Sequence, residues 1–239
     1  VGLWSDTVQK RPDNIRARNN LAAALLESHQ TEAGLAELRA ALGLRPNHPD
    51  VLRNLAKAEL MAGNTADALA HIELAQRIDP SSAAGWTLLG ATRLRAGKET
   101  EAVDAYREAR RMRPDSLAAA TGLGEALFLS GRNDEALQVL AEVSRQQPDY
   151  PGLHLTYGGA LLDAGKAAQA LAEFDAALAH DAPTAKLHHL RALALLELGR
   201  RPEAASAVRQ ALQLEAGYAP GLELEQELRE LTGKDAVRR

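Results

Sequence analysis

The sequence predicts an all-α fold, an α-solenoid of antiparallel helix pairs, and two observations support this prediction. The first is a period of 34 residues, which five prolines set and two alanines continue: Pro12, Pro46, Pro80, Pro114, Pro148, Ala182 and Ala216. The second is that apolar residues recur at helical spacing in both halves of each interval. A fixed period of this size is typical of repeat proteins, in which each unit packs only on its neighbours.

The chain contains six repeats if each repeat begins three residues after one of the prolines or alanines that mark the period. These repeats are 15–48, 49–82, 83–116, 117–150, 151–184 and 185–218. Residues 1–14 then fit the second helix of a partial repeat. Residues 219–232 fit a C-terminal capping helix, with Pro220 in its first turn and Gly233 just after its end. We expect residues 1–239 to form a single solenoid, with 233–239 as a disordered tail.

Each repeat is predicted to contain two helices, because positions 4, 7, 8 and 11 share one helical face and positions 20, 24 and 27 share another. Small residues at position 8 allow the two helices to approach closely. Position 24 carries the large residue that fills the space beside them: Leu38, Ile72, Tyr106, Leu140, Phe174 and Val208. Glycines stand where the first helix should end in a left-handed cap, except that His29 takes this position in the first repeat.

The third repeat resembles the tetratricopeptide repeat, whose pattern is W-x2-L-G-x2-Y, then A-x3-F, then P. The matching residues are Trp86, Leu89, Gly90, Ala102, Tyr106 and Pro114. The resemblance covers nearly the whole chain and implies a right-handed superhelix with a concave groove. It also implies a protein or peptide partner. His154 and His188 take the tryptophan position in later repeats, and Arg191 takes a core position, so we expect weaker packing there.

In this family the face of the first helices that lies opposite the core lines the concave groove. In this sequence that face carries positions 2, 5, 6, 9 and 13 of each repeat. The resemblance therefore implies these candidate peptide-binding residues: Arg16, Asn19, Asn20, Arg53, Asn54, Lys57, Thr87, Arg95, Thr121, Glu125 and Thr156. The predicted groove changes from basic and polar at its N-terminal end to mildly apolar around Leu155, Leu190 and Leu193. The lysine and asparagine set with which chaperone-binding members clamp two carboxylates is not reproduced, so we expect no docking of a chaperone tail.

Two features of the predicted groove have a functional and a simpler interpretation. Asn20 and Asn54 share position 6, and amides that both donate and accept hydrogen bonds could hold a peptide backbone, or could simply be solvated polar residues. Arg53 and Lys57 lie four residues apart on one face, where they repel each other. They could meet an anionic group of a ligand, or could serve solubility alone.

Composition and motifs exclude several other classes of function. The net charge of −4 provides no general attraction to nucleic acid or to an anionic membrane, and without cysteine there is no thiol chemistry. No apolar run approaches the roughly 20 residues of a membrane span, so we expect no membrane insertion by this segment.

We find no nucleophile elbow, P-loop or dinucleotide fingerprint, and interpret Gly122 and Gly124 as helix-packing glycines. His154, His180, His188 and His189 are the only metal-like group, but two of them occupy core positions. We therefore expect no catalytic residue, cofactor or metal.

The leading interpretation is a non-enzymatic scaffold that binds a peptide or protein segment in its groove. One alternative is the C-terminal repeat region of a larger membrane-bound or glycosyltransferase-like bacterial protein, which would recruit its substrate or partners. A second alternative is a self-association module that forms homo-oligomers. The bias of 22 Arg over 6 Lys indicates a GC-rich bacterial genome. The sequence is compatible with the bacterial cytoplasm, with the periplasm, and with tethering to a membrane by upstream sequence.

Overall fold

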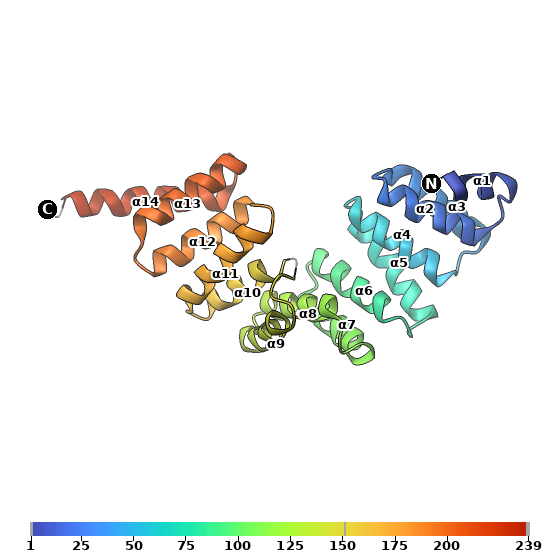
Figure 1. Ribbon diagram of the computed structural model, residues 1–239, viewed down its shortest axis with the longest axis horizontal. Helices are drawn as coiled ribbons and strands as arrows, with labels where there is room; N and C mark the ends of the chain where they lie inside the picture. The colour runs from blue at the N-terminus through green and yellow to red at the C-terminus, as the bar shows by residue number, and fades with distance from the viewer. Residues whose placement is uncertain (1, 151, 238–239) are drawn as a thin grey trace. The chain divides into compact units, whose positions relative to one another are not determined.

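The computed structural model describes residues 2–150 and 152–237, and this part of the chain contains fourteen helices and no strand (Figure 1). The predicted all-α solenoid of antiparallel helix pairs is confirmed. The helices are α1 (Gly2–Lys10), α2 (Ile15–Glu27), α3 (Thr31–Leu44), α4 (Pro49–Met61), α5 (Thr65–Ile78), α6 (Ala83–Arg95), α7 (Glu99–Met112), α8 (Leu117–Leu129), α9 (Asn133–Gln146), α10 (Leu153–Asp163), α11 (Ala167–His180), α12 (Ala185–Glu197), α13 (Arg201–Leu214) and α14 (Ala219–Val237). They form two compact units, Val1–Ala126 and Leu127–Arg239.

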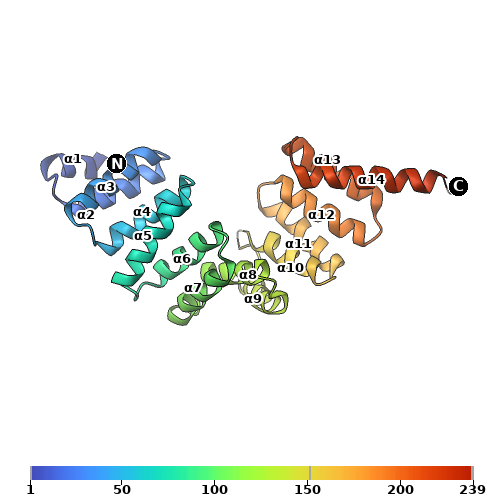
Figure 2. The same ribbon diagram turned by 180° about the vertical axis from the view of Figure 1, so that it is seen from behind.

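In the first unit, α2 packs on α3, α4 on α5 and α6 on α7, and each pair stacks on the next. The same pairs are visible from behind in Figure 2. Their core consists mainly of alanine and leucine with few aromatic rings, and Leu38, Leu55 and Ile72 are almost fully buried in it. Ala22 and Ala56, at the small position 8, are fully buried, so the close approach expected between paired helices is present.

The second unit repeats this arrangement with α10 on α11 and α12 on α13, and α14 packs on the last pair. Phe174 is completely buried in its core beside Leu195 and Val208. A side chain at Gly158 would lie only 2.8 Å from Cδ1 of Phe174, so the absent side chain is what makes room for the ring.

The turns between paired helices have the backbone conformation that the glycine pattern predicts. Gly63, Gly97, Gly131, Gly165 and Gly199 all have positive φ, between 69° and 83°. His29 takes the same left-handed conformation in the first repeat, with φ of 58°, and is the one residue other than glycine to do so in the described residues. The turn geometry is therefore kept even where the residue type is unfavourable.

Two residues expected in the core are only partly buried. Trp86 packs on the first-unit core while its indole N–H reaches the surface and donates to the carbonyl of Pro80 at 2.9 Å. Arg191 keeps 22% of its side chain exposed and pairs with Asp175 at 2.6 Å. A guanidinium can occupy a core position because its stem packs while its charged end reaches water.

The two ends of the chain differ in how they match expectation. Trp4 of α1 packs against Val8, Leu21 and Leu25, in the partial repeat that precedes the first full one. α14 continues to Val237, so the predicted helix end at residue 232 is wrong. A glycine such as Gly233 disfavours a helix by about 1 kcal/mol but ends it only where it turns left-handed. Residues 238–239 of the expected tail lie outside the described residues.

Candidate functional site

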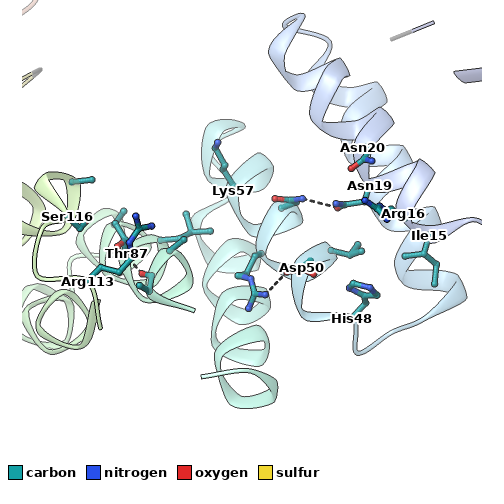
Figure 3. Close-up of a pocket in the computed structure, with 18 residues that line it drawn as sticks. Ile15, Arg16, Asn19, Asn20, His48, Asp50, Lys57, Thr87, Arg113 and Ser116 are labelled. Atoms are coloured by element: carbon teal, nitrogen blue, oxygen red, sulfur yellow. Dashed lines mark hydrogen bonds and ion pairs between the residues drawn. The ribbon is translucent and has the colours of Figure 1, made fainter. Parts of the chain in front are cut away.

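A groove of about 1010 Å³ opens on the first unit, between α2, α4 and α6 and the segment that joins α7 to α8 (Figure 3). Seven of the eleven candidate residues line it: Arg16, Asn19, Asn20, Arg53, Asn54, Lys57 and Thr87. They come together because helices separated by one repeat present the same positions on one face. Arg95, Thr121, Glu125 and Thr156 do not line this groove, and Thr156 belongs to the second unit.

The groove also contains residues outside the predicted set. Arg113, Ser116 and His48 come from the ends and connections of helices, outside the first-helix positions to which the sequence prediction is confined. Leu88, Ala91 and other small or apolar residues occupy first-helix positions, but their chemistry did not mark them as ligand contacts. The repeat register could have identified the apolar residues, whereas nothing in the repeat pattern pointed to Arg113.

Arg53 is held in place by two carboxylates, one on each side. Its Nη2 lies 2.5 Å from Oδ1 of Asp50, and its Nη1 lies 3.1 Å from Oδ2 of Asp79 in the next connection. The hydroxyl and backbone N–H of Ser81 both donate to Asp79 and lower the pKa of this carboxyl, and Arg53 lowers it further. The charge of Arg53 is therefore already compensated within the protein, which reduces the expected repulsion from Lys57.

The two asparagines at position 6 have different surroundings. Nδ2 of Asn54 donates to Oδ1 of Asn19 at 2.9 Å and so links α4 to α2 (Figure 3). Asn20, by contrast, has no side-chain hydrogen bond to any residue that the structure describes. The asparagines thus form one fixed pair between two repeats and one amide that is available to a ligand.

Three other cations also line the groove. Arg16, Lys57 and Arg113 are exposed, and no acidic group among the described residues lies within ion-pairing distance of them. The Nδ1 atom of His48 is buried in the groove wall and also lacks a hydrogen-bond partner there. The groove therefore presents excess positive charge and unused hydrogen-bonding capacity.

The remaining candidate residues and histidines are distributed over other parts of the two units. Thr121 has a buried hydroxyl without a described partner, and Glu125 adds to the effect of burial in raising the pKa of Tyr106. His154 stacks on His180 with ring centroids 5.9 Å apart, and its Nδ1 lies 2.8 Å from Glu173.

Nowhere in the described part do three His, Cys, Asp or Glu residues gather closely enough to hold a metal ion. None of the described helices is long and apolar enough to span a bilayer.

Known proteins with the same architecture were found by sequence and by structure. A family model for the tetratricopeptide repeat matches residues 25–91, 93–154 and 130–194. A solved tetratricopeptide repeat protein from Parabacteroides merdae is 19% identical, with 95% of this chain and 90% of that chain covered and a TM-score of 0.71. For pilF of Pseudomonas aeruginosa the identity is 20%, the coverage 91% and 99%, and the TM-score 0.73.

A third similar structure is YrrB, described as a repeat protein of this kind with an unusual peptide-binding site. It is 15% identical, with 93% of this chain and 97% of that chain covered and a TM-score of 0.55. At such identities the likeness concerns the fold alone. The comparison with curated proteins gave no significant match.

Proposed function

The chain belongs to the tetratricopeptide repeat family, and from this membership we propose that it is a non-enzymatic scaffold that binds an extended peptide segment in the groove of its first unit. Proteins of this fold generally act in protein interaction, and stacked repeats provide extended concave surfaces for it. The observation that supports the proposal best is the groove itself. It brings seven candidate residues from three helices together, among them cations and an amide that have no partner in the part of the chain that the structure describes.

The size and lining of the groove fit a polypeptide segment. Its volume of about 1010 Å³ is at the upper end of the range for small-molecule pockets, and it is open along the stacked first helices. Asn20 can donate to and accept from a peptide backbone, while Leu88 and Ala91 give an apolar wall for its side chains. YrrB, which shares the fold, is described as having a peptide-binding site, and this is consistent with the proposal.

A steric block tests the position of the site. Peptides selected from a random library on the wild-type chain are measured against Ala84→Trp, which places an indole in the groove at an exposed residue of α6. Ala70→Trp, at an exposed residue of α5 that does not line the groove, is the matched control. Because both residues are exposed, we expect both variants to unfold at nearly the wild-type urea concentration.

We expect the selected peptides to lose at least tenfold in affinity on Ala84→Trp and to bind Ala70→Trp as they bind the wild type. Equal binding to both variants, or a selection that yields no binding peptide, would remove the groove as the binding site.

A further inference from the structure

We propose that the groove recognises an acidic segment, through negatively charged side chains spread along the segment and not through a terminal carboxylate. This inference rests on the proposed function and specifies the partner of the same groove. It follows from how the charges of the lining residues are paired and where they are located.

Only part of the positive charge in the groove is neutralised by the protein itself. Four of the lining residues are Arg or Lys and one is Asp. That carboxylate, Asp50, is engaged by Arg53, which also holds Asp79. Arg16, Lys57 and Arg113 are left without an acidic partner among the described residues, and all three are exposed. A ligand can therefore approach them without first breaking an ion pair.

This positive charge is a local feature of the groove. Residues 1–126 contain 16 Lys and Arg and 16 Asp and Glu, so the first unit as a whole is neutral. The surplus of cations in the groove must be balanced by acidic residues on other surfaces of the unit. Such a separation of charge raises the association rate and the selectivity for an anionic partner, while the overall net charge of −4 disfavours polyanions at large.

These three cations lie on three different elements. Arg16 is in the first turn of α2, Lys57 is in α4, and Arg113 follows the last residue of α7 (Figure 3). Three cations on two helices and one connection fit several anionic groups spaced along a chain better than one carboxylate, which a single guanidinium can already bind in a bidentate manner. An extended segment with repeated Asp or Glu supplies such spacing, because its side chains project every few ångströms along the chain.

Polar and apolar groups between the cations fit the remainder of such a segment. The Asn54 side chain is fixed by Asn19, so its own carbonyl oxygen keeps a defined position from which to accept a backbone N–H. Leu88 and Ala91 on α6 contact whatever lies between the acidic residues. We therefore expect small or apolar residues to alternate with the acidic ones.

The test uses fluorescently labelled 12-residue peptides with amidated C-termini, measured by anisotropy on the full chain. Three sequences of equal length are compared: alternating Glu-Ala, Gln-Ala and Lys-Ala. We expect the Glu-Ala peptide to bind at least tenfold more tightly than the other two. Its affinity should fall steadily as salt rises from about 0.05 to 0.5 M, because exposed charges are screened over about 10 Å at 0.1 M salt.

Charge-removing variants locate the effect. Arg16→Ala, Lys57→Ala and Arg113→Ala are each expected to weaken Glu-Ala binding by about two- to fivefold, the range of exposed ion pairs, and their combination to abolish it. The matched control removes three exposed arginines that do not line the groove, Arg39, Arg77 and Arg145, and changes the net charge equally. We expect this control to bind the Glu-Ala peptide within about twofold of the wild type.

Several results would overturn the inference. Equal binding of Gln-Ala and Glu-Ala peptides would show that charge has no role in recognition. It would not contradict peptide binding in the groove, which the comparison of Ala84→Trp with Ala70→Trp tests separately. Equal weakening by the groove and control variants would reduce the effect to net charge. A requirement for a free C-terminal carboxylate would contradict recognition along the segment, and absence of Glu-Ala binding would reject it.

Discussion

The ring of Tyr106 occupies the space that a side chain at Gly122 would need. A Cβ atom at Gly122 would overlap the ring and hydroxyl of Tyr106, and a Cβ at Gly90 on its other side would lie 2.8 Å from Cδ2. Two glycines from successive first helices thus accommodate one aromatic side chain, which is only 4% exposed. The large residue at position 24 of this repeat is therefore matched by glycines in two neighbouring helices.

We expect Gly122→Ala to lower the free energy of unfolding by about 1–3 kcal/mol, the usual cost of overpacking a well-filled core. Urea unfolding followed by circular dichroism measures it. Gly43→Ala is the matched control, because it also changes a helical glycine, but the added Cβ would meet no described atom within 4 Å apart from its chain neighbours and its own helix backbone. Since alanine favours a helix, Gly43→Ala should stabilise the protein by up to about 1 kcal/mol. In a Tyr106→Leu background Gly122→Ala should cost less, and an unchanged cost would contradict the packing explanation.

The helix pairs and the turns between them could be predicted from the sequence because the same pattern of residue types recurs in every repeat. Position 8 is small and position 24 is large in every repeat, and the glycine turns recur at the same spacing. The sequence predicts Gly122 to be a packing glycine but does not identify its partner, since the space that it leaves is filled by a residue of the preceding repeat. Trp86 and Arg191 could not be placed either, because a pattern indicates which face of a helix points inward but not how far a long side chain extends.

The candidate site was less predictable, because its properties depend on contacts between repeats. Lining positions follow from the register, and seven of the candidate residues do line the groove. The ion pair between Arg53 and Asp79 joins residues that are 26 positions apart in the sequence. The hydrogen bond between Asn54 and Asn19 joins residues that are 35 positions apart. Neither is visible in a single helix. Arg113 lies in a connection, where the repeat pattern does not specify which way a side chain points.

His29 provides a second test, this time of backbone conformation. Its φ of 58° places a residue with a Cβ in the left-handed region, which costs roughly 1–2 kcal/mol for an L-residue. We expect His29→Gly to raise the free energy of unfolding by about 0.5–1 kcal/mol, with the urea midpoint raised and the slope unchanged. Gly97→Ala is the reverse control. Its φ is 69°, and apart from its chain neighbours no described atom lies within 4 Å of an added Cβ, so backbone strain alone should destabilise this variant. Destabilisation by His29→Gly would show that its side chain contributes more than its strain costs.

Phe174 and Trp86 are expected to differ in their energetic roles, although both are large aromatic residues in a repeat core. Phe174 is completely buried, so Phe174→Ala should cost about 3–5 kcal/mol. Trp86 is partly exposed, so Trp86→Ala should cost clearly less than Phe174→Ala. Trp86→Phe keeps most of the packing and removes the hydrogen bond to Pro80, which should cost about 0.5–1.5 kcal/mol. All three are measured by urea unfolding, and equal losses for the two alanine variants would contradict the difference in burial.

The stability of the protein should decrease at mildly acidic pH because of two adjacent histidines in α12. Burial lowers the pKa of His188 below its ordinary value of 6.5, and the nearby Arg191 lowers it further. Burial also lowers the pKa of His189, with Glu223 acting in the opposite direction. The unfolded chain therefore binds more protons than the folded one just below pH 6.5. The contribution of these two histidines to the free energy of unfolding is therefore fully present above about pH 6.5, and it is lost as the pH falls below that value.

We expect the urea midpoint of the wild-type chain to fall between pH 7.5 and pH 5.5, and to fall less in the His188→Gln, His189→Gln double variant. The comparison stays above the range in which Asp and Glu take up protons, so those carboxylates contribute little to the difference. His29→Asn is the control, because it removes an exposed histidine and asparagine tolerates the left-handed conformation. The same pH slope in wild type and double variant would mean that His188 and His189 do not couple protonation to folding. A slope reduced equally in His29→Asn would assign the effect to histidines in general instead of to His188 and His189.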